Sequence, residues 1–344
     1  MAFSHKRKSG LSKGVLSAII ITVISFVALT VLIVVNLFVP IKYLSTYALS
    51  YEIREECTGR ITYIDVGTGE CILCELPDGK VLLIDGGNGS YANQKRILTT
   101  LNSRKIESID YLICSSVKEE HCGGLAEIVK YKKVTRAYIP YSTNTRITES
   151  YYSFICALEE SGAEVKIANV GEGVNGENYF FTFLSPSSYL SQSSEYADMN
   201  ALSNKANIDN ASAVVWLECD GISFAFTSDV REDVLKKMVD SYKMCKALGQ
   251  EYCPQGDKRV ELEECDFVTV SGHGNDKNTY APWYDITLPE IALLGIGENS
   301  SQTLSTESLF NIDGVGAELY ITMDSGNITV TVKDGKYFLN KEKK

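Results

Sequence analysis

The feature that most constrains this chain is an apolar run near its N-terminus. Residues Val15 to Val39 (VLSAIIITVISFVALTVLIVVNLFV) span 25 positions without one charged side chain. As a helix rising about 1.5 Å per residue, the run exceeds the roughly 30 Å hydrocarbon core of a bilayer. The sequence therefore predicts one transmembrane helix, followed by about 300 residues outside the hydrocarbon core.

The charges before this run predict its orientation. His5, Lys6, Arg7, Lys8 and Lys13 precede it with no acidic residue among them. By the positive-inside rule, residues 1–14 form a cytoplasmic basic tail and the rest of the chain lies on the extracytoplasmic side of the cell membrane. A cleaved signal peptide is the alternative. The run is longer than an ordinary signal-peptide core and no clear small-x-small cleavage site follows it, which favours a retained signal anchor.

The exported part is acidic. The whole chain has a net charge of −11, and leaving out the four Lys and Arg of the tail brings it to −15. Such a surface repels phosphate backbones, so the charge argues against nucleic-acid binding. The expected partners are the membrane and an unidentified extracytoplasmic ligand or protein.

All ten cysteines follow the apolar run, on the side where disulfides can form. Their connectivity cannot be read from the sequence, and a structural or redox ectodomain organised by cysteines is one hypothesis for the chain. Cys71 and Cys74 form a CxxC string, but residues i and i+3 of a strand face opposite sides, which argues against a thioredoxin-like role.

Strand-like and helix-like patterns alternate after a linker at residues 40–58. Residues 59–338 are expected to form one α/β (α+β) domain, and residues 339–344 a charged tail. Hairpins at both ends of each half, and helices following strands, predict layered sheets covered by helices on their outer faces. Residues 185–207 are rich in Ser and Asn and predict a long exposed loop.

Six segments of this domain carry a family resemblance. In order they read ITYIDVGTGECILCELPDGKVLLIDGG, IDYLICSSVKEEHCGGL, DNASAVVWLECDGISFAFTSDV, CDFVTVSGHGND, IALLGIGENS and ELYITMDSGNITVTVKDGK. Together they resemble the metallo-β-lactamase-fold domain of ComEC-type competence proteins over residues 59–336. The resemblance implies a four-layer αβ/βα sandwich with a dinuclear metal site at one edge of two sheets, in which a metal-activated water hydrolyses phosphodiesters or other esters. ComEC-type proteins form a DNA channel from many membrane helices, whereas this chain has one predicted span.

The metal-binding loop of that family is altered here. The family pattern is Thr-His-x-His-x-Asp-His-x-Gly-Gly, and in the segment Ser115 to Gly124 it places Ser116 and Lys118 at the first two histidines. Glu120 takes the position of the Asp, and His121 that of the last His. In the family, the first two histidines bind one metal and the other two residues bind the second, so the losses fall on one metal position.

The retained ligand positions continue downstream. By the resemblance, Asp229 matches the carboxylate that bridges the two metals, and His273 lies where relatives carry His-His-Gly-Ser. Which histidine of that pair ligates stays open. Glu120, His121, Asp229 and His273 would suit one divalent ion, zinc or manganese, and a metal-free site is the alternative.

Lys118 is the most unusual substitution in this loop. A protonated lysine offers three donors and no lone pair, so it cannot ligate a metal. Its ammonium either replaces the lost ion in holding an anionic group, or closes the site as a salt bridge with Asp229 and Glu120. In a mononuclear hydrolase, water activated beside Asp229 would attack an ester while Lys118 stabilises the developing charge.

Further positions matching the family motif have expected supporting roles. Asp65 and Asp85 are expected to brace the metal loop by accepting backbone N–H bonds. Asn210 and Ser212 either contact substrate or cap a turn. Two cysteines flank the altered loop, Cys114 and Cys122; thiolates ligate zinc well, but both lie at apolar positions that favour core packing.

These observations leave three hypotheses for the exported domain. The first is a catalytically impaired metallo-β-lactamase-like domain that binds a ligand or a partner. The second is a mononuclear metal-dependent hydrolase. The third is the cysteine-organised ectodomain.

Overall fold

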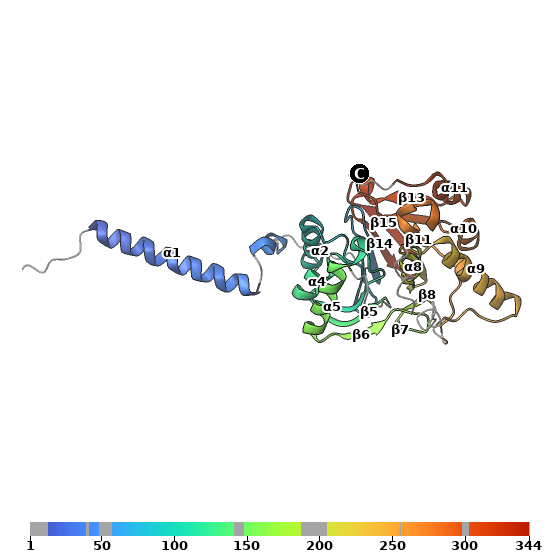
Figure 1. Ribbon diagram of the computed structural model, residues 1–344, viewed down its shortest axis with the longest axis horizontal. Helices are drawn as coiled ribbons and strands as arrows, with labels where there is room; N and C mark the ends of the chain where they lie inside the picture. Colours follow the sequence, from blue (N-terminus) through green and yellow to red (C-terminus); the bar gives the residue numbers. More distant parts are fainter. Residues whose placement is uncertain are drawn as a thin grey trace, which may run out of the picture.

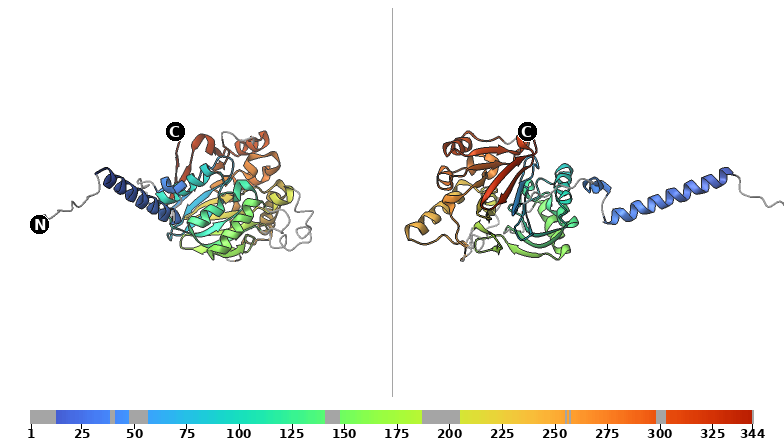
Figure 2. Two further views of the ribbon diagram at one scale, coloured as in Figure 1. Left: turned by 60° about the vertical axis from the view of Figure 1, so that its left-hand side comes forward. Right: turned by 180° about the vertical axis from the view of Figure 1, so that it is seen from behind.

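Two β-sheets face each other, and helices cover the outer side of each sheet (Figure 1). The computed structural model describes residues 13–38, 41–47, 57–140, 148–186, 205–254, 256, 258–297 and 303–343. Helices α2, α4 and α5 cover one sheet, and α9, α10 and α11 cover the other (Figure 2). The predicted four-layer αβ/βα sandwich, the metallo-β-lactamase fold, is confirmed.

The first half of the chain builds most of one sheet. Its elements are α1 (Lys13–Phe38), η1 (Ile41–Thr46), β1 (Gly59–Tyr63), β2 (Ile72–Glu75), β3 (Val81–Ile84), α2 (Tyr91–Ser103), β4 (Ser108–Ile113), α3 (Glu119–Cys122), α4 (Leu125–Tyr131), β5 (Lys133–Ile139), α5 (Glu149–Ser161) and β6 (Glu164–Ile167).

The second half builds the other sheet and completes the first. Its elements are β7 (Gly173–Gly176), β8 (Tyr179–Ser185), α8 (Lys205–Asn210), β9 (Val214–Cys219), β10 (Ile222–Phe226), α9 (Glu232–Ala247), η2 (Leu262–Glu264), β11 (Phe267–Thr269), η3 (Ser271–Gly274), η4 (Asp276–Asn278), α10 (Ala281–Thr287), β12 (Ile291–Leu294), α11 (Thr306–Gly314), β13 (Glu318–Ile321), α12 (Thr322–Ser325), β14 (Ile328–Lys333) and β15 (Lys336–Lys341).

The strand order shows that distant parts of the chain close the sheets. The first sheet runs β15-β14-β1-β2-β3-β4-β5-β6, and the second runs β13-β12-β11-β10-β9-β8-β7. Strand β14 pairs antiparallel with β1 from Gly59↔Val332 to Tyr63↔Ile328. The C-terminal hairpin therefore belongs to the sheet that the N-terminal half begins.

Aromatic side chains fill the space between the two sheets. Phe181, Phe183, Phe224 and Phe267 are all buried there, and the rings of Phe224 and Phe267 stack with centroids 4.7 Å apart. Such offset contacts add to the area term that drives burial. This core fixes the two sheet edges relative to each other, and the functional side chains described below lie at those edges.

The cysteines pack as apolar residues. Cys74 lies in the core between the sheets and Cys71 in the core beneath α2, α4 and α5, which confirms the predicted opposite facing of the CxxC pair. Cys114 and Cys122 are both buried in that second core. Within the described part of the chain, no disulfide joins the cysteines.

Side-chain caps start the helices that cover the first sheet. Ser90 accepts the N–H of Asn93 at the start of α2, and Thr148 accepts that of Tyr151 at the start of α5. These bonds satisfy helix donors that have no intrahelical partner. Gly162 ends α5 in the left-handed conformation at φ 70°.

The boundaries differ from expectation in a few places. Within the predicted linker 40–58, η1 forms a short helix that packs on α2. Strand β15 runs to Lys341, three residues beyond the predicted domain end at Phe338. Most of the predicted loop 185–207, residues 187–204, lies outside the described residues, and β7 and α8 had no clear sequence pattern.

Helix α1 carries the apolar run. Residues Gly14 to Asn36 have a mean hydropathy of 3.1 in their most apolar window, and none of that window is buried against the protein. Within the described ranges it is the one helix long and apolar enough to cross a membrane.

Candidate metal centre

The candidate site forms where several strands end at a common edge. Asp85 directly follows β3, Ser115 comes two residues after β4, Asp229 follows β10 and His273 follows β11. Because β3 pairs parallel with β4, and β10 with β11, their carboxyl ends meet at the same edge of each sheet. Helix α3 then carries His121 to this edge.

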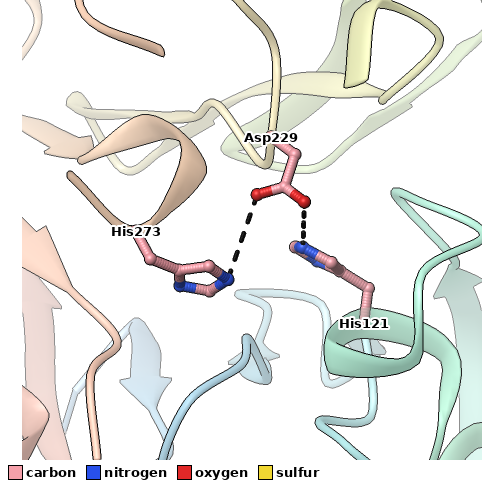
Figure 3. A group of neighbouring side chains, drawn as sticks. All are labelled: His121, Asp229 and His273. Atoms are coloured by element: carbon pink, nitrogen blue, oxygen red, sulfur yellow. Dashed lines mark ion pairs between the residues drawn. The ribbon is translucent and has the colours of Figure 1, made fainter. Parts of the chain in front are cut away.

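Three predicted ligands converge in the structure. His121, Asp229 and His273 come from separate elements and point toward one another (Figure 3). One Asp229 oxygen, Oδ2, lies 3.1 Å from His121 Nε2, and the other, Oδ1, lies 3.9 Å from His273 Nε2. All three side chains are buried. The fold thus brings these three predicted ligand residues close together.

Hydrogen bonds orient both imidazole rings. His273 Nδ1 lies 2.9 Å from the carbonyl oxygen of Gly295, so Nδ1 carries the proton and Nε2 a lone pair. His121 Nδ1 lies 2.7 Å from Asp85 Oδ2. Within the described residues, neither Nε2 has a hydrogen-bonding partner of good geometry. Both Nε2 atoms therefore face Asp229 with their other nitrogen fixed by an outer partner, as in histidine metal sites.

Backbone strain gathers at the same place. Asp85, Ser228 and His273 have φ values of 61°, 49° and 53°, which non-glycine residues adopt at a cost. His273 lies between two glycines that also have positive φ, Gly272 and Gly274. The flanking glycines let the chain turn sharply enough to present the ring of His273 inward.

Charges within the site shift the pKa values of its members. Burial opposes ionisation of Asp229, but His121 and Lys118 outweigh it and hold the pKa of this carboxyl well below its usual value. Burial also opposes the charge of His121, and Asp229 and Asp85 nevertheless raise its pKa well above the ordinary value. Burial lowers the pKa of His273, which keeps this ring neutral.

Lys118 reaches into the site. Its Nζ lies 2.6 Å from Asp229 Oδ2 and 2.6 Å from Asp209 Oδ1. Burial opposes its charge, but Asp229 and Asp209 raise the pKa of Lys118 above the ordinary value. The ammonium bridges two buried carboxylates beside the histidines. The expected salt bridge with Asp229 is present, while Glu120 Oε1 lies 3.9 Å away, at the limit of ion pairing.

Asp209 is the partner that the sequence did not indicate. It lies on α8, its side chain is 4% exposed, and Arg231 NH1 is 3.9 Å from its other oxygen. Its position directly before the motif Asn210-Ala211-Ser212 was the one available signal. Nothing in the spacing linked it to Lys118, because α8 follows the long polar segment.

Two predicted metal-loop residues lie apart from the converging set. Glu120 keeps its carboxylate partly exposed, beside Lys118. Glu120 also contributes its backbone carbonyl, which accepts the N–H of Glu70. Ser116 is buried and its carbonyl lies 3.2 Å from Cys114 Sγ, so this residue shapes the loop.

A second acidic group lies behind His121. Glu70, Asp85 and His121 place ligand atoms within 4.8 Å of one another. Burial raises the pKa of Glu70 to about 8, which keeps this carboxyl protonated near neutral pH. Tyr63 OH lies 3.3 Å from Glu70 Oε1. We interpret the group as support for His121, because Asp85 already binds its Nδ1.

Of the residues predicted to support the site, one contacts the metal loop and the others do not. Asp85 braces the loop, since its Oδ1 accepts the N–H of Ser115 at 2.7 Å. Asp65 instead accepts the N–H of Gly67 within its own turn. Asn210 donates to Asp233 at the start of α9, and Ser212 is buried beside the site without contributing a ligand atom to the converging set.

The donor set fits one divalent cation. Imidazole nitrogens and carboxylate oxygens are the ligands of zinc and similar ions, and here two nitrogens and a carboxylate lie within 4.8 Å of one another. The charges agree with this fit. Four carboxylates, Asp85, Glu120, Asp209 and Asp229, lie around Lys118, Arg231 and the His121 ring, which is protonated without a metal. Exchange of the His121 proton for a divalent ion would bring the sum of these charges from −1 to zero.

Sequence comparison gives a relative for this domain. No family model matches the chain. ComE operon protein 3 of Bacillus subtilis (strain 168) is 22% identical over 257 residues, which are 70% of this chain and 29% of that protein. Over this domain the chain is similar to a ComEC-type protein. It spans under a third of the length of this relative, and the predicted resemblance is confirmed for the metallo-β-lactamase-fold domain.

Solved structures similar to the ComEC-like domain are more distant. CmlA from Streptomyces venezuelae, a diiron β-hydroxylase, is 14% identical, with 81% of this chain and 55% of that chain covered and a TM-score of 0.49. The metallo-β-lactamase fold protein YhfI from Bacillus subtilis is 10% identical, with 82% of this chain and all of that chain covered and a TM-score of 0.45.

Proposed function

We propose that this is a membrane-anchored, extracytoplasmic ComEC-like domain that binds one divalent metal ion and, with it, an anionic ligand. Helix α1 is the anchor, with the basic tail in the cytoplasm. The ion is held by His121, Asp229 and His273. The observation that carries the proposal is the pair of buried Nε2 atoms, each fixed by an outer partner and aimed at one carboxylate.

Lys118 takes the place of the other cation. Its Nζ approaches the same oxygen of Asp229, Oδ2, that faces His121. An ammonium can hold an anionic group by charge and hydrogen bonds, but it has no empty orbital with which to acidify water. Lys118 thus replaces the charge of the second ion of a dinuclear hydrolase, but it cannot replace that ion's ability to activate water. Impaired hydrolysis follows from this difference.

The bound ion would supply a Lewis acid that polarises an oxygen of the ligand. The residues of the chain do the rest. Asp85 and the Gly295 carbonyl hold the two rings in place, and Lys118 is itself held by Asp209. An anionic oxygen arriving beside Lys118 would accept a hydrogen bond from one of its three N–H groups.

Metal content tests the proposal directly. The full-length protein in detergent is dialysed against zinc and then manganese, and bound metal is measured by mass spectrometry. We expect about one equivalent. His121→Ala and His273→Ala should each abolish it. His5→Ala is the matched control, because it changes the only other histidine of the chain. Two equivalents, or no metal above background, would refute the single-ion site.

The second candidate function is hydrolysis by the single ion. It is favoured by the position of Asp229, whose ionised carboxylate lies between the Nε2 atoms of His121 and His273, where it would orient a water on the metal. A chromogenic phosphodiester, assayed with the metal-loaded protein, tests it. Turnover that disappears in Asp229→Ala and His121→Ala supports a hydrolase. Turnover that survives in both comes from a contaminating enzyme, and none at all leaves ligand binding as the function.

A further inference from the structure

The segment directly after the membrane helix is built into the domain. Tyr43, in η1, is only 1% exposed. Its ring stacks on Tyr91 of α2 with centroids 5.7 Å apart, and meets Tyr131 at the end of α4 edge-on at 5.5 Å. A buried aromatic cluster of this kind fixes the segment that carries it.

Polar contacts hold the same segment at further points. Tyr43 OH donates to Gln94 Oε1 and Tyr91 OH donates to the Lys42 carbonyl, both at 2.5 Å. Asn102 Nδ2 donates to Thr46 Oγ1 at 2.8 Å. The Lys42 ammonium also pairs with Glu127 of α4. Residues 42–46 are therefore a clip that joins the start of the ectodomain to α2 and α4.

The clip lies close to the end of the membrane helix. Helix α1 ends at Phe38 and η1 begins at Ile41. From Phe38 to Ile41 the chain advances by three residues, which span at most roughly 10 Å when extended. The headgroup region of one leaflet is about 5 to 7 Å thick. The helix face that holds the clip is therefore within reach of the headgroups.

The exposed side chains beside the clip suit a lipid headgroup region. Tyr47, Tyr91 and Tyr152 are 44%, 50% and 59% exposed, and the ammonium of Lys42 is also exposed. These four residues define the juxtamembrane face. Tyrosine is enriched at membrane interfaces because its ring is apolar and its hydroxyl is polar. A groove of about 660 Å³ between α4 and α5, lined in part by Tyr152 and Glu127, continues the face.

Both views of the molecule agree with this placement. Helices α2, α4 and α5 lie on the side of the domain from which η1 and α1 leave, while α9 and α11 lie on the far side (Figure 2).

We propose that the juxtamembrane face docks on the phospholipid headgroups of the bilayer that α1 spans, and that the Tyr43 clip sets this orientation. The inference rests on the anchor in the proposed function and is independent of the metal ion. The domain then lies with its α2-α4-α5 layer on the membrane, in one orientation.

Photo-crosslinking to lipid tests the docking. The full-length protein is placed in nanodiscs of phosphatidylethanolamine and phosphatidylglycerol, with benzoylphenylalanine replacing Tyr152, which makes no clip contact, or, as the matched control, Phe310. Phe310 is 75% exposed on α11, on the far side of the domain. We expect lipid adducts at position 152 about tenfold above those at position 310, equivalent to about 1.4 kcal/mol of preference. Equal yields at both positions, or protein adducts in place of lipid adducts at position 152, would overturn the docking.

The clip is tested in the same nanodiscs. Tyr43→Ala removes the ring that joins η1 to α2 and α4, and we expect the adduct yield at position 152 to fall about tenfold, again about 1.4 kcal/mol. Tyr43→Phe keeps the ring contacts and should keep most of the adduct. Unchanged docking in Tyr43→Ala would show that the clip does not set the orientation.

A further measurement separates the two proposals. Extraction of the same membranes with alkaline carbonate shows whether α1 anchors the chain. A chain that resists extraction but gives no adduct at position 152 keeps its anchor and refutes the docking. A chain that is extracted loses the anchor of the proposed function, and the docking fails with it.

Discussion

Asp85 holds the metal loop through both of its carboxylate oxygens. Oδ1 accepts the N–H of Ser115, and Oδ2 lies 2.7 Å from His121 Nδ1 and accepts the hydroxyl of Ser115. The same carboxylate therefore orients the histidine and fixes the strand end from which the loop begins. Removing its charge should affect the candidate metal site before it affects the fold.

Asp85→Asn should weaken metal binding. The amide cannot accept from all three donors, so the ring of His121 loses its fixed orientation, and we expect a roughly 10- to 100-fold loss of affinity. Competition with a chromogenic chelator measures it. Asp78→Asn is the control, because Asp78 pairs with Lys80 in an exposed turn. An unchanged affinity in Asp85→Asn would contradict the role assigned to this carboxylate.

Lys118→Met should destabilise the metal-free protein. The apolar side chain leaves Asp209 and Asp229 buried without their shared cation, and breaking such a pair costs roughly 3 to 5 kcal/mol. Denaturant unfolding measures the loss, and added zinc should restore part of it, because the ion binds one of the two carboxylates.

The control for this change is Lys80→Met at the exposed Asp78 pair, which should shift stability by less than about 0.5 kcal/mol. If Lys118→Met were as stable as the unaltered chain, Lys118 would not be the compensating charge of the site.

At the scale of elements, the ligand loop is held by close backbone contacts. A Cβ at Gly124, at the start of α4, would lie 2.2 Å from the Gly86 carbonyl oxygen, which belongs to the turn after β3. A Cβ at Gly69, in the turn between β1 and β2, would lie 2.5 Å from the Glu120 carbonyl oxygen. The turn after β3, the turn between β1 and β2, and the α3–α4 segment thus pack backbone against backbone. This contact fixes the position of His121 at the sheet edge.

Gly124→Ala should therefore displace α3 and α4. Backbone cannot yield as a flexible side chain does, so we expect a loss of about 1 to 3 kcal/mol in unfolding free energy together with weaker metal binding. Gly314→Ala in α11 is the matched control, since no atom of the described part of the chain outside the helix lies within 4 Å of its added Cβ. It should be neutral or stabilising by up to about 1 kcal/mol. Equal effects of the two substitutions would contradict the packing argument.

Some elements and site residues could be predicted from the sequence, and others could not. Alternating apolar residues and the turn Pro77-Asp78-Gly79 predicted β2 and β3, because strand periodicity and turn chemistry are local. Motif positions predicted His121, Asp229 and His273. Asp209 and the role of Glu70 could not be predicted, since both depend on packing between segments far apart in the chain. Asp65, predicted to brace the loop, instead accepts the N–H of Gly67 within its own turn.

At the scale of the whole molecule, the C-terminal hairpin completes the first sheet. Ile328, Val330 and Val332 of β14 are each at most 1% exposed and lie in the core between the sheets. A truncation after Gly326 should remove this strand, expose the edge of β1 and prevent cooperative folding, because three lost core side chains, at about 2 to 5 kcal/mol each, are comparable to the whole 5 to 15 kcal/mol stability of an ordinary domain. Protease resistance and the unfolding transition measure the effect.

A truncation after Lys341 is the control for the hairpin. It keeps every pairing between β14 and β15, from Ile328↔Lys341 to Lys333↔Lys336, and should leave a folded domain. A stable, protease-resistant chain ending at Gly326 would show that the first sheet closes without its last two strands.

The pairing of β1 with β14 also sets an order in time. Gly59 cannot form its strand pairing until Val332 has been synthesised, 273 positions later (332 minus 59). At about 5 to 20 residues per second, synthesis of that interval takes roughly 15 to 55 s. During this interval, the edge of β1 that later pairs with β14 has no hydrogen-bonding partner, and the apolar side chains that β14 later covers stay exposed. A nascent chain of this kind needs a chaperone or a delay in collapse, and its biogenesis should be most vulnerable to aggregation just before the last hairpin emerges.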